Sequence, residues 1–194
     1  MLPFRKLDIK FNVNGLAEEL NSSGLFGKHP YRGMPGSVHE QMKDIWVRYK
    51  DPVEHIESGD FSGMADPHES MWLEDIQSIK DIAYSLMRYL EGSSLGGVLV
   101  TKLPPGGEIY PHTDDGWHAS YYDKYYIPVS NPSGAKFHFN NGSIDPEDGD
   151  VYAFRNDVTH WVTNNTNKNR IAMIICIRQN KLTREGLPCH GQQR

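Results

Sequence analysis

The second half of the chain alternates apolar and polar residues with a period of two, and this pattern restricts the folds open to it. The alternation occupies short stretches separated by turns rich in Gly, Pro, Asn or Asp, at 97–103, 107–114, 122–130, 135–140, 150–155, 160–164 and 170–178. Many short strands at such spacing are typical of a sandwich or a jelly roll. The sequence therefore predicts a mainly β fold whose jelly-roll core covers about 96–178.

The first half of the chain supplies elements that can pack on this core. Apolar residues recur at helical spacing over 73–91, which predicts one long amphipathic helix. The patterns at 7–13 and 45–49 predict strands, and 15–20 a short helix. Loops are expected at 22–42 and 51–70, which are rich in Gly, Pro and polar residues, and the second loop is a candidate lid. We expect a single domain over 1–180 and a polar C-terminal tail over 181–194.

Composition narrows the class of protein. The chain has 194 residues, which is enough for one domain with a sizeable core. Its net charge of −5 gives no indication of binding to nucleic acid or an anionic membrane. Residues 1–6 lack the apolar run of a signal peptide, and no stretch approaches the roughly 20 apolar residues of a membrane span. Cys176 lies in an apolar run and Cys189 in the polar tail, so we expect no disulfide framework and a cytoplasmic protein.

The motif His112-Thr113-Asp114 carries the strongest chemical signal in the sequence. Alternate residues of a strand point to the same face, so His112 and Asp114 can reach one metal ion. His160 opens a later predicted strand and can complete the ligand set. Two imidazoles and one carboxylate, with three coordination positions left open, form the facial triad of non-haem Fe(II) oxygenases. Three N/O ligands would also suit catalytic zinc.

Arg170 favours iron over zinc. It follows His160 by ten residues and opens the last apolar strand, where its side chain could enter the same cavity. A guanidinium stays charged and binds a carboxylate through two parallel hydrogen bonds, as a dicarboxylate cosubstrate requires. A zinc hydrolase needs no such anchor, and it would need a general base that only Asp115 or Glu108 could supply. Asp115 is expected to point away from His112.

The remaining histidines are not assigned as ligands. His118 and His138 are spare imidazoles, and we expect His138 to be a hydrogen-bonded interior residue. Five other histidines lie in loop-like or tail segments and are given no role: His29, His39, His55, His68 and His190. A lid could, however, carry His55 and His68 to the substrate.

From about 96 to 178 the chain resembles the Fe(II)/2-oxoglutarate-dependent dioxygenases, and more narrowly their aspartyl/asparaginyl (and proline) β-hydroxylase-like branch. The resemblance rests on Pro104–Asp114, Tyr126-Ile127-Pro128, Gly149-Asp150-Val151, His160 and Arg170. It implies a double-stranded β-helix, a cupin-like jelly roll, that uses O2. It also implies Fe(II) held by His112, Asp114 and His160, and 2-oxoglutarate bound by Arg170. Tyr122 stands where this family often has a second cosubstrate contact, and Thr101 is a weaker candidate.

One departure limits what the resemblance implies about the substrate. Animal members of the branch that hydroxylate protein domains have glycine where this chain has Asp114. The carboxylate also argues against halogenation. The resemblance therefore implies hydroxylation of a C–H bond in an amino acid, a peptide side chain or a small metabolite, with release of succinate and CO2. The alternative is a cupin-like metal-binding module without oxygenase activity, which would not need Arg170.

Overall fold

The computed structural model describes residues 2–50, 53–60 and 71–179. The expected tail over 181–194 and much of the candidate lid lie outside the described residues. The strands are β1 (Phe4–Lys10), β2 (Lys43–Tyr49), β3 (Met71–Trp72), β4 (Gly92–Leu103), β5 (Glu108–His112), β6 (Asp123–Ser130), β7 (Ala135–Phe139), β8 (Gly142–Ile144), β9 (Asp150–Phe154), β10 (His160–Asn164) and β11 (Arg170–Gln179). The helices are α1 (Leu16–Ser22), the 3-10 turn η1 (Pro30–Gly33), α2 (Val53–Ser58), α3 (Gln77–Tyr89) and α4 (Gly116–Tyr121).

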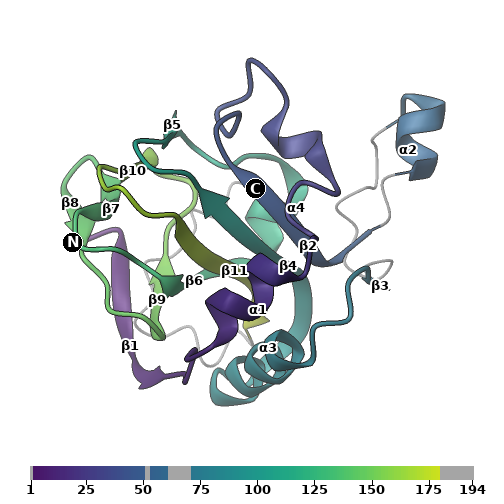
Figure 1. Cartoon of the computed structure of the whole chain (residues 1–194). Coiled ribbons are helices and arrows are strands. Elements are labelled where there is room, and N and C mark those ends of the chain that lie inside the picture. Colours follow the sequence, from purple (N-terminus) through teal and green to yellow (C-terminus); the bar gives the residue numbers. More distant parts are fainter. Residues whose placement is uncertain (1, 51–52, 61–70, 180–194) are drawn as a thin grey trace.

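Two antiparallel sheets build the molecule (Figure 1). The larger has the order β1-β9-β6-β11-β4-β2-β3, and the smaller has the order β5-β10-β7-β8. Apolar residues from both sheets meet in one buried cluster, including Leu103 and Tyr126 from the larger sheet and Phe137 and Val162 from the smaller. The sheets therefore pack face to face, as the predicted jelly roll requires.

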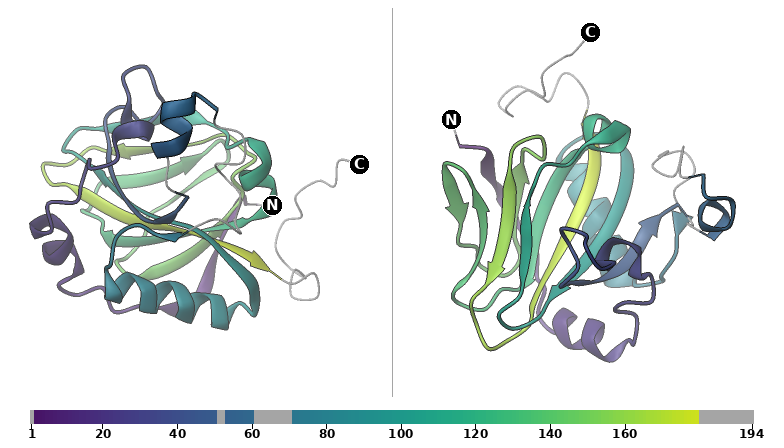
Figure 2. Two further views of the ribbon diagram at one scale, coloured as in Figure 1. Left: turned by 90° about the vertical axis from the view of Figure 1, so that its right-hand side faces the viewer. Right: turned by 90° about the horizontal axis from the view of Figure 1, so that it is seen from above.

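Helices cover the other face of the larger sheet. Figure 2 shows α1 and α3 lying along one side of the strands. Leu20 of α1, Ile79 and Leu86 of α3, and Val98 of β4 are fully buried in a second apolar cluster there. The predicted amphipathic helix thus forms and packs on the sheet. None of the helices within the described ranges is long and apolar enough to cross a membrane.

Several element boundaries differ from the sequence-based predictions. The long helix begins at Gln77 instead of 73, because Ile76 has extended backbone angles (φ −109°, ψ 97°). The first strand covers Phe4–Lys10 instead of 7–13, and beyond it the Phe11 amide leaves the regular ladder to bond the Gly149 carbonyl at 2.9 Å. The short elements η1, α2, β3, α4 and β8 were not predicted, because two to six residues are too few to show a period.

Candidate active site

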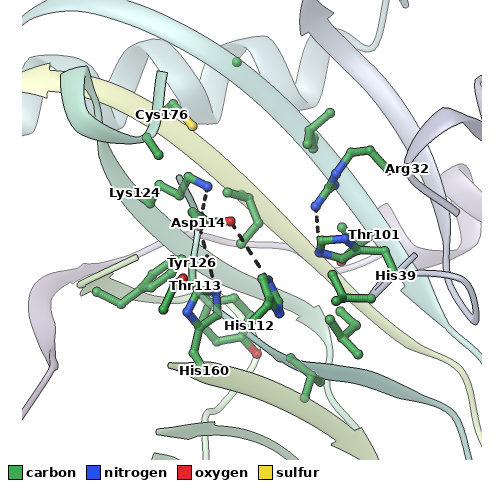
Figure 3. Close-up of a pocket in the computed structure, with 18 of the residues that line it drawn as sticks. Arg32, His39, Thr101, His112, Thr113, Asp114, Lys124, Tyr126, His160 and Cys176 are labelled. Carbon is green, nitrogen blue, oxygen red and sulfur yellow. Dashed lines mark hydrogen bonds and ion pairs between the residues drawn. The ribbon is translucent and has the colours of Figure 1, made fainter. Parts of the chain in front are cut away.

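A cavity of about 530 Å³ lies between the two sheets, a volume within the range of small-molecule sites. Figure 3 shows side chains from both sheets and from the segment after η1 pointing into it. The predicted ligands and Arg170 all line this cavity, which places them in one chemical compartment.

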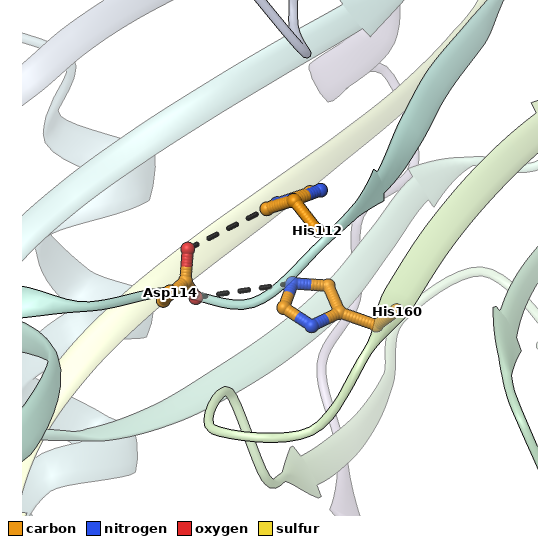
Figure 4. Close-up of side chains that lie close together, drawn as sticks. All are labelled: His112, Asp114 and His160. Atoms are coloured by element: carbon orange, nitrogen blue, oxygen red, sulfur yellow. Dashed lines mark ion pairs between the residues drawn. The ribbon is translucent and has the colours of Figure 1, made fainter.

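His112, Asp114 and His160 come together as predicted (Figure 4). Their potential ligand atoms all lie within 4.8 Å of one another, and they are the metal-type cluster found among the described residues. Asp114 Oδ1 is 3.9 Å from His112 Nε2, and Asp114 Oδ2 is 3.8 Å from His160 Nε2. At this spacing the three groups would need only small movements to hold one ion together.

Strand pairing fixes the two imidazoles. His112 ends β5 and lies directly opposite His160, the first residue of β10, so the ring centroids are 4.4 Å apart. His112 Nδ1 is 2.7 Å from the Tyr110 carbonyl, and His160 Nδ1 is 2.9 Å from the Val158 carbonyl. Because a carbonyl only accepts, both Nδ1 atoms carry hydrogen, and Nε2 of each ring faces Asp114. These bonds therefore orient both rings so that Nε2 is the atom that would bind a metal.

Asp114 reaches the cluster by a different route from the one predicted. The strand expected over 107–114 ends at His112, and the Asp114 amide bonds the Asn156 carbonyl at 2.8 Å in the loop before β10. Lys124 of β6 contacts Asp114 Oδ2 at 2.5 Å. Burial by itself would raise the pKa of Asp114, but Lys124 and the two imidazoles outweigh it and lower the pKa. The carboxylate is therefore ionised, as a metal ligand must be.

Arg170 forms a buried cationic site in the same cavity. It is 2% exposed, its Nη2 donates to the Tyr126 hydroxyl at 3.0 Å, and its Nε has no partner within the described part of the chain. Burying a cation with an unpaired hydrogen-bond donor costs folding free energy unless an anion binds to it. This orphaned donor fits the carboxylate of a dicarboxylate cosubstrate.

Tyr122, the predicted second cosubstrate contact, does not line the cavity. Its ring is fully buried against His118 and Tyr121, at centroid distances of 4.7 and 4.9 Å. Tyr126 contacts Arg170 instead. The sequence alone could not separate the two tyrosines, because both lie on the same face of the strand predicted over 122–130, and only the start of β6 at Asp123 leaves Tyr122 outside the strand. Thr101 does line the cavity, and its hydroxyl donates to the Ala172 carbonyl at 3.4 Å.

The structure adds cavity residues that the sequence did not mark. Arg32 and His39 enter from the predicted loop over 22–42, and Lys124 and Cys176 enter from β6 and β11. The ring of His39, to which no role was assigned, lies against that of His112 at 4.8 Å. Burial, with help from Arg32 and His112, lowers the pKa of His39 to about 2, so the imidazole is neutral.

The other histidines and Asp115 lie in different surroundings. His118 lines the cavity, and burial lowers its pKa to about 4. His138 lies outside the lining and bonds Thr163 at 2.8 Å, so it is hydrogen-bonded as expected, but it is half-buried and not interior. Asp115 is exposed at the cavity rim and does not belong to the ligand cluster. His55 lies in α2 within 2.6 Å of the Asp60 carbonyl, while His68 lies outside the described residues.

Three solved structures with a similar fold are prolyl hydroxylases. A viral collagen prolyl hydroxylase from Paramecium bursaria Chlorella virus-1, solved with 2-oxoglutarate, is 13% identical, with a TM-score of 0.58 over 93% of this chain and 97% of that one. A Trichoplax adhaerens prolyl hydroxylase bound to a hypoxia-inducible-factor peptide is 13% identical, with a TM-score of 0.59 over 95% and 87%. A Pseudomonas putida prolyl-4-hydroxylase is 12% identical, with a TM-score of 0.57 over 92% and 93%. These likenesses establish the fold.

The family is established by the sequence. No curated protein matches the chain. The aspartyl/asparaginyl β-hydroxylase profile matches residues 79–180, more than half of the chain and the part that carries His112, Asp114, His160 and Arg170. The chain therefore belongs to the aspartyl/asparaginyl β-hydroxylase family and is an Fe(II)- and 2-oxoglutarate-dependent hydroxylase.

Proposed function

We propose that His112, Asp114 and His160 hold Fe(II), and that Arg170 with Tyr126 binds a carboxylate of 2-oxoglutarate. The proposal is carried by the buried guanidinium, whose Nε has no partner among the residues that the structure describes, in the cavity that also holds the ligand cluster. When bound, the iron and 2-oxoglutarate supply the oxidation of a substrate C–H bond by O2, with release of succinate and CO2.

The chain's own residues fix the geometry before the metal arrives. The Tyr110 and Val158 carbonyls hold the two imidazoles with Nε2 toward the site. Lys124 holds Asp114 Oδ2 and so keeps the carboxylate beside the two imidazoles, where it would help to hold the ion. Such hydrogen-bond partners orient metal ligands and tune their basicity.

The walls of the cavity protect the bound cosubstrate from water. Arg170 neutralises the carboxylate, and the Tyr126 hydroxyl orients the guanidinium. Apolar side chains of Ile109, Val162 and Ala172 line the same cavity. A charged hydrogen bond is strong in such surroundings, because little water competes for either partner.

We propose that the substrate is an amino acid or a peptide side chain. Trp117 of α4 lines the cavity and is 49% exposed, so the cavity reaches the surface beside this indole. An aromatic ring at an opening can hold an incoming side chain. The bound peptide in the Trichoplax structure is consistent with this class of substrate.

Two further proposals concern the chain as a whole. We propose that residues 1–180 fold as one domain, because β1 pairs with β9 inside the larger sheet. We propose a cytoplasmic location, because Cys176 is a free thiol among the described residues, as is usual in a reducing compartment. Cys189 lies outside the described residues.

An anaerobic titration with Fe(II) and 2-oxoglutarate tests the function. The chelate has a weak visible charge-transfer band, and we expect it to form with the wild type and to be lost at the same cosubstrate concentration in Arg170→Ala. Folded, iron-loaded wild type without the band would instead support the cupin-like module, which does not use 2-oxoglutarate.

A further inference from the structure

The segment that follows η1 is tied to the metal-binding strand. The Tyr110 amide donates to the Val38 carbonyl at 3.0 Å. Gln41 accepts from the Glu108 amide at 3.1 Å and donates to the Tyr110 hydroxyl at 2.7 Å. These bonds join residues far apart in the sequence, so the segment is held in register with His112, two residues further along β5.

Arg32, in η1, is anchored on the wall of the cavity. Its Nη1 donates to Asp44 Oδ2 at 3.0 Å, and the Asp44 side chain is 3% exposed in β2. Its Nη2 lies 3.1 Å from His39 Nε2. A guanidinium has five N–H donors, and these two contacts leave others available. The Arg32 side chain remains 31% exposed and lines the cavity.

The contact with Arg32 fixes the tautomer of His39. A guanidinium can only donate, so Nε2 of His39 accepts and the hydrogen of the neutral ring is on Nδ1. The His39 ring also packs against the ring of His112, the proposed iron ligand. Arg32 therefore keeps unused hydrogen-bond donors beside the metal cluster, and the His39 ring holds the guanidinium there.

The position of this pair separates it from the cosubstrate anchor. In Figure 3, Arg32 and His39 lie on one side of Asp114 and His112, and Tyr126, the partner of Arg170, lies on the other. Val38, Met42 and Leu99 line the same cavity, and a charged hydrogen bond to an anion is strong in such apolar surroundings. An anion with two oxygens fits a guanidinium better than a single neutral carbonyl does.

We propose that Arg32, held in place by His39 and Asp44, binds a carboxylate of the organic substrate, on the side of the metal cluster opposite Arg170. The inference rests on the proposed function and names the chemistry of its substrate. The carboxylate can be the main-chain carboxylate of an amino acid or peptide end, or the side chain of an acidic residue. Arg32 is then a specificity-determining residue and His39 its partner.

The test compares acids with matched amides. One series pairs each N-acetyl amino acid with its N-acetyl amide, and a second pairs capped tripeptides that carry Asp or Asn in the centre. The readout is succinate formed above the level without substrate, at saturating Fe(II) and 2-oxoglutarate. For wild type, we expect at least one series to prefer the acid by about 30-fold or more in kcat/KM. The series that responds identifies the source of the carboxylate.

The variant Arg32→Gln assigns the preference to this residue. We expect the acid-to-amide ratio to fall to within about threefold of unity, because a neutral amide no longer favours the anion. A merely structural loss would lower activity on acid and amide equally and leave the ratio unchanged. Arg88→Gln, on the exposed face of α3, is the matched control and should keep the wild-type ratio.

Arg32→Gln leaves the Asp44 carboxylate buried and unpaired, so this variant could fail to fold. A second variant keeps the test possible in that case. Arg32→Gln combined with Asp44→Asn removes both charges and should show the same collapsed ratio. The inference is overturned if wild type responds to no acid, if it treats acid and amide alike, or if the folded double variant keeps the preference. Wild type that oxidises 2-oxoglutarate should form some succinate even without added substrate. If the proposed function is wrong, this background succinate is absent, whereas failure of the present inference alone leaves it in place.

Discussion

Two walls of the cavity are built in different ways. His112, His160 and Arg170 form what we call the strand wall, since each stands at an end of β5, β10 or β11. Arg32 and His39 form the loop wall, in and after η1, held by side-chain and backbone bonds to β5 and β2. Strand register positions the first wall, whereas long-range contacts position the second. The strand wall therefore carries the proposed chemistry, and the loop wall the proposed choice of substrate.

The largest expected effect comes from removing a proposed metal ligand from the strand wall. Even hydrogen-bond partners of ligands are worth 10- to 100-fold, so His160→Ala should reduce Fe(II) binding and turnover by at least about 1,000-fold. Metal analysis and succinate formation measure the two effects. The matched control is His138→Ala on the neighbouring strand β7, which lies outside the cavity lining and should retain iron. Full iron content in His160→Ala would remove this residue from the ligand set.

The next test removes the buried cation of the same wall. Arg170→Gln should raise the KM for 2-oxoglutarate on the order of 100-fold, because a desolvated charge partner is lost. Iron content should stay near that of wild type, since Arg170 is not a proposed ligand. Arg178→Gln is the control on the same strand, where the guanidinium bonds the Tyr121 carbonyl at 2.6 Å. An unchanged KM in Arg170→Gln would place the cosubstrate elsewhere.

A smaller effect compares the two tyrosines. Tyr126→Phe removes one hydrogen bond to a charged group and should raise the KM for 2-oxoglutarate about 10-fold. Tyr122→Phe should have a smaller effect, since Tyr122 does not line the cavity. Steady-state kinetics with 2-oxoglutarate as the varied reactant decide between them. The reverse order of effects would restore Tyr122 as the second cosubstrate contact.

The smallest effect concerns stability against pH in the metal-free protein. Burial lowers the pKa of His118 from 6.5 to about 4, so the unfolded chain takes up a proton first as the pH falls. Stability is thus present above about pH 6.5 and is lost progressively toward about pH 4. Thermal unfolding at pH 7.5 and 5.0, with chelator present, measures this loss. In His118→Phe the decrease in Tm should be about 4 °C smaller than in wild type. An equal decrease would mean that other groups cause the acid sensitivity.

The predictions held best where the backbone is regular. The strands of the jelly roll, the long helix and the convergence of His112 with His160 follow from a period of two, a period of 3.6 and turn-forming residues. Arg170 was found for the same reason, as the first residue of an apolar strand. Asp114 lies beside these two histidines as predicted, but strand alternation is not the reason. Its amide donates to the Asn156 carbonyl in a loop, beyond the end of β5.

The sequence by itself determined the fold class, the proposed iron ligands and the buried cation, because strand alternation places side chains on known faces. Only the tertiary structure decided that Tyr126, and not Tyr122, meets Arg170, since that depends on where β6 begins. It alone brought Arg32 and His39 to the cavity. An irregular segment has no period to read, and its place is set by hydrogen bonds to strands far along the chain.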